Sequence, residues 1–249
     1  MWASPAPPRR GVRARQDLPP AAFGFDELVP DPGDDLVAVG GDLAPETLVE
    51  AYRHGYFPMG LGGGGRGPIG WWAPQPRGVL LPERIHVSRS LARSMRRFEV
   101  RVDTAFEHVV AGCADPSRPG AWITRDVARA YARLHRLGWA HSVEVFAAGE
   151  LVGGLYGVSL GGLFAAESKF HRVTDASKAA VVALADLLGQ DGVSGRLIDV
   201  QWRTDHLATL GVEEVDRSRY DVLRRQATAL PIPSAFSARP DRPNSYDGG

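Results

Sequence analysis

A carboxylate and an amide, Asp199 and Gln201, stand two positions apart in the segment RLIDVQW that spans residues 196–202. Strand side chains alternate between two faces, so Asp199 and Gln201 share one face, about 7 Å apart, and Ile198 and Val200 share the other. The apolar pair indicates an inner strand, where a buried carboxylate and amide are costly unless they bind each other or a ligand. The segment therefore predicts a site; a strand end that emerges into solvent is the alternative.

A second acid, Glu167, lies among small apolar residues in a predicted strand over residues 163–170. A carboxylate in that setting can accept hydrogen bonds from a substrate amine or from ribose hydroxyls. It could equally pair with Lys169, although adjacent residues of a strand face opposite sides. Glu167 is therefore a candidate binding residue, and an ion pair with Lys169 that has only a structural role is the alternative.

Basic and aromatic side chains suggest where a nucleic acid could bind. A predicted amphipathic helix over residues 88–98 carries on one face Arg89, Arg93, Arg96 and Arg97. Such a face is most often only solvated, but it would serve as a phosphate site if the ligand were a tRNA. Three tryptophans in Pro- or Gly-flanked stretches could offer a stacking surface to a base, although Trp is more often a core residue: Trp71, Trp72 and Trp122.

Several other chemistries lack their motifs in this chain. Cys113 is the single cysteine, which excludes an internal disulfide and a thiolate zinc cluster. The seven histidines show no metal-ligand spacing, and there is no G-x-S-x-G motif. The glycine run 62–65 follows no strand and precedes no Lys-Ser/Thr pair, so it is not a phosphate loop. We expect neither a metal nor a cofactor.

The charges are balanced overall but separated along the chain. Residues 17–46 contain eight acids and no Lys or Arg, whereas residues 84–101 contain six arginines and one acid. A chain of this kind can hold a polyanion on one face and repel it elsewhere. No run of eighteen apolar residues and no secretory signal is present, so we expect a cytoplasmic protein that does not bind membranes.

The hydrophobic periodicity predicts an α+β or mixed α/β chain. Expected strands cover residues 35–39, 141–146, 151–160, 163–170 and 196–202, and expected helices cover 46–54, 88–98, 125–137, 176–188 and 206–210. Seven glycines between residues 60 and 70 predict a flexible loop that separates a small N-terminal unit from the rest. We expect a disordered arm over 1–16, a small N-terminal domain over 17–70, a larger domain over 71–230 and a disordered tail over 231–249.

A series of motifs, in order and with matching spacing, resembles the leucyl/phenylalanyl-tRNA–protein transferase family. The N-terminal motifs are VGGDLAPE at 39–46, AYRHGYFP at 51–58 and WWAPQPR at 71–77. The later ones are AWIT at 121–124, AHSVE at 140–144, LVGGLYGV at 151–158, ASK at 176–178, and Ile198-Asp199 with Gln201. The likeness covers nearly all of residues 25–220.

The resemblance implies a small N-terminal domain and a C-terminal domain with a GNAT acetyltransferase-like fold. It implies transfer of Leu or Phe, which could extend to Met, from aminoacyl-tRNA to proteins with an N-terminal Lys or Arg. The product would enter the N-degron degradation pathway. We expect the transferase to act as a monomer.

The resemblance also assigns residues. Asp199 and Gln201 match the catalytic pair, Glu167 an acidic site residue, and Trp122 and Tyr131 the aromatics around the terminal adenosine. The positions around the aminoacyl side chain are Leu155, Phe164, Val181, Leu184 and Ile198. Two departures stand out: Met59 replaces a Trp of the adenosine site, and Lys169 replaces a Met, which puts a cation at an apolar pocket and bears on donor choice.

Aminoacyl transfer needs no ATP or metal, because the tRNA ester is already activated. An amide is a very poor base, so we expect Gln201 to orient the incoming amine and Asp199 to fix that amide or balance developing charge. Two alternatives stay open. A GNAT-like acyl-CoA N-acetyltransferase is disfavoured by the lack of glycine in residues 171–175, and a non-catalytic RNA-binding module would need neither Asp199 nor Gln201.

Overall fold

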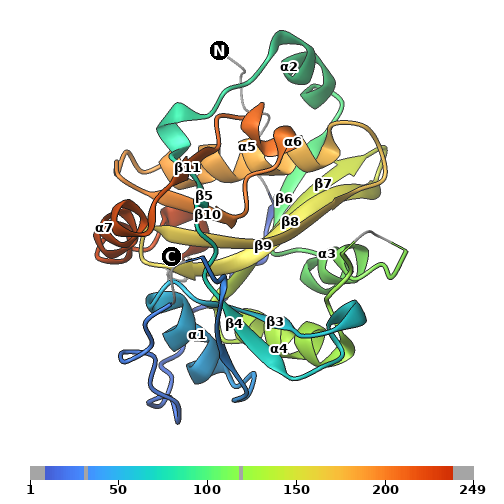
Figure 1. The fold of residues 1–249 in the computed structure, drawn as a ribbon. Coiled ribbons are helices and arrows are strands. Elements are labelled where there is room, and N and C mark those ends of the chain that lie inside the picture. The colour runs from blue at the N-terminus through green and yellow to red at the C-terminus, as the bar shows by residue number, and fades with distance from the viewer. Residues whose placement is uncertain (1–8, 31–32, 118–119, 238–249) are drawn as a thin grey trace, which may run out of the picture.

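The computed structural model describes residues 9–30, 33–117 and 120–237 (Figure 1). Its helices are α1 (Pro45–Arg53), α2 (Arg89–Met95), α3 (Phe106–Cys113), α4 (Arg125–Arg136), α5 (Ala176–Gly189), α6 (Asp205–Ala208) and α7 (Arg217–Thr228). Its strands are β1 (Arg9–Arg10), β2 (Leu36–Val39), β3 (Phe57–Gly60), β4 (Ile69–Trp72), β5 (Arg77–Leu80), β6 (Glu99–Val102), β7 (Ala140–Ala147), β8 (Glu150–Leu160), β9 (Leu163–His171), β10 (Leu197–Gln201) and β11 (Glu213–Val215). The mixed α/β organisation with a small N-terminal unit is confirmed.

The small N-terminal unit contains a sheet of order β2-β4-β3 and the helix α1. Pro45 occupies the first turn of α1, where its missing N–H costs nothing, and Gly55 follows the helix with a φ of 84° that glycine adopts without strain. The glycine-rich residues 60–70 were expected to separate two units. They instead connect β3 to β4 of one antiparallel hairpin, so the boundary expected at residue 70 falls inside β4.

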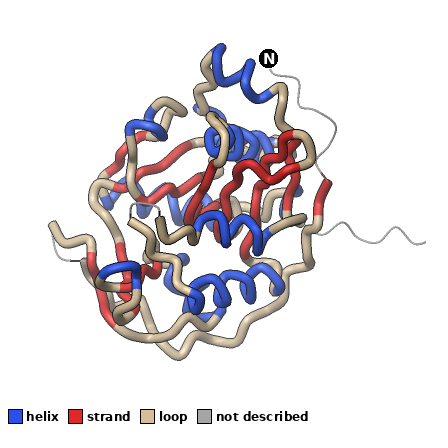
Figure 2. The backbone as a smooth tube through the Cα atoms, turned by 90° about the vertical axis from the view of Figure 1, so that its right-hand side faces the viewer, coloured by secondary structure: helices blue, strands red, loops and turns tan. Residues whose placement is uncertain are grey.

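A larger sheet dominates the rest of the chain, with the order β1-β6-β7-β8-β9-β10-β5-β11. The expected β7-β8-β9 meander is confirmed, and its strands pair antiparallel. Helices lie on both sides of the strands (Figure 2). One core packs α5 and α2 against the sheet, and the other packs α1, α3, α4 and α7 on the opposite face (Figure 1).

The strands β9 and β10 pair in parallel over a short stretch and then separate. Their register runs from Leu197 opposite Leu163 to Asp199 opposite Ala165, where the pairing ends. A bulge in the β8–β9 pairing falls at the same level, because Tyr156 lies opposite Ser168 but Gly157 lies opposite Ala166. A Cβ on Gly157 would come within 2.1 Å of the Ala165 carbonyl oxygen, so this close approach requires glycine. The gap between β9 and β10 opens at the predicted site.

Residues 9–16 and 231–237, which belong to the stretches 1–16 and 231–249 expected to be disordered, make defined contacts with the rest of the chain. In the N-terminal arm, β1 pairs with β6, and Arg15 Nη2 donates to the Ser159 carbonyl oxygen at 2.8 Å while its guanidinium stacks on Trp139. In the tail, Phe236 is 3% exposed and stacks on His141 and Phe164. Burial of these side chains offsets the entropy of ordering residues that a Pro- and Arg-rich composition makes irregular. Residues 1–8 and 238–249 lie outside the described residues.

No helix within the described part of the chain is long and apolar enough to cross a membrane.

Candidate active site

The strand β10 is central, as predicted, but its alternation breaks at Gln201. Leu197 belongs to the core that contains α7, whereas Ile198 belongs to the core that contains α5. A bulge in the β10–β5 pairing follows Asp199, and Gln201 has a φ of 62°, a left-handed conformation that costs a non-glycine residue about 1–2 kcal/mol. Asp199 and Gln201 therefore do not share a face, which corrects the period-two expectation.

Two features, one within β10 and one on the neighbouring strand β5, stabilise this bulge. Asp199 Oδ1 accepts a hydrogen bond from the backbone N–H of Gln201 at 3.0 Å, a local turn that competes with regular strand geometry. On the neighbouring strand, a Cβ on Gly78 would lie 2.8 Å from the backbone nitrogen of Arg203, so only glycine lets the chain pass there. The strain at Gln201 thus follows from its surroundings.

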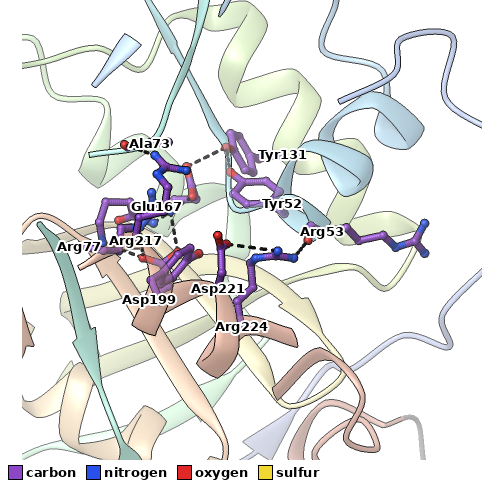
Figure 3. Close-up of polar contacts among 12 residues, drawn as sticks. Tyr52, Arg53, Ala73, Arg77, Tyr131, Glu167, Asp199, Arg217, Asp221 and Arg224 are labelled. Carbon is purple, nitrogen blue, oxygen red and sulfur yellow. Dashed lines mark hydrogen bonds and ion pairs between the residues drawn. The ribbon is translucent and has the colours of Figure 1, made fainter. Parts of the chain in front are cut away.

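The Asp199 carboxylate is saturated by hydrogen bonds (Figure 3). Arg77 binds it with two contacts, from Nε to Oδ1 at 2.9 Å and from Nη2 to Oδ2 at 2.7 Å, and the Tyr220 hydroxyl donates to Oδ2 at 2.7 Å. Burial alone would lower the pKa of Arg77, but the facing Asp199 charge raises it above its ordinary value. Burial raises the pKa of Tyr220, so the phenol keeps its proton. With Asp199 and Arg77 only 1% and 2% exposed, this is a closed ion pair rather than a substrate contact.

The side-chain amide of Gln201 contacts groups on β9 and β10 other than the Asp199 carboxylate. In one orientation Nε2 lies 3.4 Å from Glu167 Oε1. In the exchanged orientation, Nε2 instead donates to the carbonyl oxygens of Val200 and Ala166, at 2.9 Å each, and its contact with Glu167 is lost. The amide oxygen is then the part of the side chain that is directed toward Glu167 and the gap between the strands.

Glu167 is the unpaired residue of the β9 bulge, and it ends a short chain of hydroxyl groups. The Tyr131 hydroxyl donates to Glu167 Oε2 at 2.8 Å, and Tyr52 of α1 contacts Tyr131 through their hydroxyls. Burial raises the pKa of Glu167 to about 7, because the hydrogen bonds of the two phenols only partly offset the loss of solvent. Burial also raises the pKa of Tyr131 and Tyr52, so the phenols act as donors.

A cavity of about 300 Å³ occupies the gap between β9 and β10. One wall of the cavity is apolar and contains Leu155, Val181, Leu184 and Ile198. Its polar groups include Glu167 and Gln201, which lie at the same level as the bulges. An apolar pocket with a few convergent polar groups, one of them with a perturbed pKa, has the composition of a small-molecule site.

The cavity brings together most of the predicted site residues. Those that line it are Met59, Trp122, Leu155, Glu167, Lys169, Val181, Leu184, Ile198 and Gln201. The cavity lining does not include Asp199, Tyr131 or Phe164. Asp199 accepts a hydrogen bond from the Gln201 backbone, and Tyr131 donates one to Glu167, so both contact residues of the cavity lining without lining it themselves. Phe164 is fully buried in the core against Phe236.

Sequence reasoning missed five contributors to the site. Arg77 and Tyr220 bind Asp199, Tyr52 extends the Glu167 chain, and Phe57 and Trp202 line the cavity. The signal available for Arg77 was the cost of an unpaired buried carboxylate, which requires a cation somewhere in the chain. Nothing in the sequence indicated which arginine it would be.

The predicted phosphate-binding arginines lie apart from the cavity. The helix α2 begins at Arg89, capped by the Ser88 side chain, and ends at Met95, so it is shorter than predicted. Arg89, Arg93, Arg96 and Arg97 are on the surface, and Arg97 Nη2 donates to the Thr174 carbonyl oxygen at 3.2 Å. Figure 1 shows α2 at the end of the molecule opposite to α1. Among the described residues, no group of three or more His, Cys, Asp or Glu side chains could hold a metal ion.

Comparisons with known proteins agree with this architecture. A family model described as leucyl/phenylalanyl-tRNA protein transferase matches residues 79–225, and the model of that family's N-terminal domain matches residues 41–75. Proteins named leucyl/phenylalanyl-tRNA–protein transferase are similar to most of this chain. The one from Aromatoleum aromaticum is 49% identical, covering 84% of this chain and 86% of the relative. The one from Chromohalobacter salexigens is 51% identical, covering 82% and 79%.

Solved structures are only distantly similar. A conserved protein of unknown function from Bacteroides thetaiotaomicron is 11% identical, with a TM-score of 0.35 over 64% of this chain and 58% of that one. L-PGS from Bacillus licheniformis is 10% identical, with a TM-score of 0.34 over 66% and 55%. Similarities this weak do not assign a fold.

The fold thus defines a two-part α/β protein with a partly apolar cavity between separating strands. The chain belongs to the leucyl/phenylalanyl-tRNA–protein transferase family.

Proposed function

We propose that this chain transfers leucine or phenylalanine from an aminoacyl-tRNA to the N-terminal amine of an acceptor protein that begins with Lys or Arg. Family membership supports the reaction class. The observation that carries the proposal is the cavity of about 300 Å³ that ends at Glu167 and Gln201, since it provides an apolar pocket beside hydrogen-bonding groups. The product would be a substrate for N-degron degradation, and the enzyme would act in the cytoplasm as a monomer.

The aminoacyl side chain of the donor would occupy the apolar wall. Leu155, Val181 and Leu184 come from β8 and α5 and give a surface suited to Leu or Phe. Discrimination between apolar side chains is about 1–3 kcal/mol per methylene, so Met could also be used. Lys169 lines the same cavity, and a cation there would disfavour the apolar donors unless its ammonium reaches solvent.

The chemistry is an exchange of an ester for an amide. The neutral α-amine of the acceptor attacks the ester carbonyl carbon, the C–N bond forms, and the C–O bond to the tRNA ribose breaks. The proton lost by the amine is balanced by the proton gained by the ribose oxygen. Holding amine and ester together supplies much of the acceleration, up to about 7–11 kcal/mol in favourable intramolecular cases.

Gln201 would orient the attacking amine. With Nε2 bound to two backbone carbonyl oxygens, the amide oxygen accepts a hydrogen bond from the amine and directs its lone pair toward the ester. Glu167, whose pKa is about 7, would bind the α-amino group of the donor or carry the proton between amine and ribose. Trp122 and Met59 would contact the terminal adenosine from the other wall of the cavity.

Asp199 would act as a positioning residue. Its carboxylate is occupied by Arg77, Tyr220 and the Gln201 backbone, so it holds Gln201 in the left-handed conformation rather than touching substrate. The arginine face of α2 would bind tRNA phosphates away from the cavity. The larger unit would have the GNAT-like fold; its antiparallel meander followed by α5 and the parallel strand β10 supports this.

One assay tests the proposal against its rivals. Radiolabelled Leu-tRNA or Phe-tRNA is mixed with the enzyme and a peptide that begins with Arg, and the label is followed onto the peptide. A labelled peptide supports the transferase. Transfer from acetyl-CoA but not from charged tRNA would establish the acyl-CoA alternative, and tRNA binding without transfer would establish the RNA-binding module.

A further inference from the structure

The exposed indole of Trp202 marks the rim of the cavity. Trp202 follows Gln201 directly, lines the same cavity and is 40% exposed. The Phe57 ring packs against it in a T-shaped arrangement, with ring centroids 5.2 Å apart. An indole that is fixed in this way and left partly open offers a flat face to a ligand beside the reacting groups.

A carboxylate lies at the edge of that indole. Asp35 Oδ2 accepts a hydrogen bond from Trp202 Nε1 at 3.4 Å, and Asp35 Oδ1 accepts one from the Gln75 backbone at 3.1 Å. Asp35 directly precedes β2 of the small N-terminal unit, whereas Trp202 directly follows β10 of the large sheet. The two units therefore meet at this side of the cavity.

Asp35 keeps its charge available for a ligand. Among the described residues, no Lys, Arg or His forms an ion pair with it. Arg217, which approaches Gln75, donates to the carbonyl oxygen of Ala73 at 2.9 Å and to the side-chain oxygen of Gln75 at 3.2 Å in the satisfied orientation of that amide. The nearby guanidinium is thus bound to carbonyl groups.

An aromatic face with a carboxylate at its edge suits a cation that carries hydrogen-bond donors. The indole attracts positive charge through its quadrupole, and the carboxylate accepts from the N–H groups of a guanidinium or an ammonium. A neutral side chain would lose the charge component of both interactions, and an acidic side chain would be repelled by Asp35. The negative charge of the surrounding segment also favours a cation, because Asp35 belongs to residues 17–46, which contain eight acids and no Lys or Arg.

We propose that Trp202 and Asp35 form the subsite for the positively charged side chain of the acceptor's first residue. This inference rests on the proposed transfer reaction and names the residues that select its acceptor. The α-amine and the side chain of that residue branch from one Cα, which matches the adjacency of Gln201 and Trp202. The acidic unit would attract the basic acceptor terminus, while the arginine face of α2, at the other end of the molecule, attracts the tRNA (Figure 1).

The test compares two peptides that differ only in charge at the first side chain. One begins with Arg and the other with citrulline, whose neutral urea has nearly the same shape. The preference for Arg, as a ratio of kcat/KM values, is measured for the wild type, Asp35→Asn and Trp202→Leu. Because the ratio is internal to each enzyme, loss of folded protein cancels. Glu27→Gln is the matched control, since it removes an exposed acid elsewhere in the same unit.

We expect the wild type to prefer Arg, and each variant to lower that preference about five- to tenfold. The loss should come from a higher KM for the Arg peptide, with unchanged values for the citrulline peptide and for charged tRNA. Glu27→Gln should keep the wild-type preference.

The remaining outcomes separate the two hypotheses. A wild type that labels neither peptide contradicts the proposed function itself. A wild type that transfers without preferring Arg, or variants that keep its full preference, would overturn the subsite and leave the transferase intact. A Trp202→Leu variant whose KM rises for charged tRNA instead would show that the indole serves the donor, which also overturns the proposal.

Discussion

Two carboxylates flank the gap between β9 and β10, and the protein holds them in opposite ways: Asp199 is buried and Glu167 is half-buried. Asp199 receives two hydrogen bonds from Arg77, one from Tyr220 and one from the Gln201 backbone. Within the described part of the chain, no arginine, lysine or histidine forms an ion pair with Glu167, which lines the cavity and has a pKa of about 7.

This difference in charge stabilisation suits the two carboxylates to different roles, one structural and one chemical. A carboxylate with a bidentate arginine keeps one charge state and one geometry, so it can fix a strained backbone such as that of Gln201. A carboxylate whose charge is only partly stabilised can bind a substrate amine or exchange a proton near neutral pH. Under the proposed function, Asp199 would therefore fix the geometry of the site, and Glu167 would contact the substrate or exchange a proton with it.

We expect the largest effect on stability and activity from removal of the buried Arg77–Asp199 ion pair. Asp199→Asn leaves the Arg77 charge buried without its partner, so the free energy of unfolding should fall by about 3–5 kcal/mol, and transfer activity should fall with it. Denaturant unfolding followed by tryptophan fluorescence measures the first quantity. The double variant Arg77→Gln/Asp199→Asn, which buries no charge, should recover part of the stability. A single variant as stable as the wild type would mean that the ion pair does not hold the site.

The second effect concerns Gln201 alone. Gln201→Asn keeps an amide and tolerates the left-handed backbone, but its oxygen falls one methylene short of the cavity. We expect the single-turnover transfer rate at saturating substrates to fall about 10- to 100-fold, with little change in stability. Ser168→Ala, which alters another polar residue of the cavity lining, is the matched control and should retain most of the rate. Wild-type turnover in Gln201→Asn would remove the amide from the mechanism.

The third effect tests the raised pKa of Glu167. Between pH 4.5, the ordinary pKa of a glutamic acid, and about 7, the unfolded chain loses the Glu167 proton while the folded chain keeps it. Stability contributed by this residue therefore falls as pH rises through that window, by on the order of 3 kcal/mol. Glu167→Gln removes this cost, so its Tm should exceed that of the wild type by about 5–10 °C at pH 8 and match it at pH 4.

Activity should move in the opposite direction from stability in this variant. The wild-type rate is expected to rise with pH through an inflection near 7 from Glu167 and another near 8 from the acceptor amine. Glu167→Gln should lose the first inflection and part of the rate. A Tm difference that does not depend on pH would show that Glu167 ionises as an ordinary solvent-exposed acid.

The smallest effect is expected far from the cavity. Replacing Arg89, Arg93 and Arg96 by Gln should flatten the dependence of log affinity for charged tRNA on log salt, by about 0.7–0.9 for each tRNA phosphate that the protein no longer neutralises. The chemical step at saturating donor should be unchanged. An unaltered salt slope would mean that this face is only solvated.

Much of this architecture could be predicted from the sequence, for identifiable reasons. The β7–β9 meander and α5 follow from strong local periodicity, and Pro45 and Gly55 delimit α1 by their own backbone preferences. The apolar wall of the cavity followed from the family resemblance, and Leu155, Val181 and Leu184 do line it.

Tertiary interactions account for what could not be predicted. The bulge at Gln201 depends on Gly78 of another strand and on the side chain of Asp199, neither of which a period-two pattern contains. The meeting of Asp35 and Trp202 joins positions 167 residues apart. The order of residues 9–16 and 231–237 depends on surfaces such as Trp139 and His141 that are created only when the larger sheet has formed.

The most direct test of the central claim is a crystal structure with a stable donor mimic, phenylalanyl-adenosine joined by an amide in place of the ester. We expect the phenyl group against Leu155, Val181 and Leu184, and the carbonyl carbon next to the Gln201 amide and Glu167. Binding elsewhere, for example in the open hollow of about 840 Å³ between α3 and the end of β9, would contradict the assignment of the cavity as the donor site.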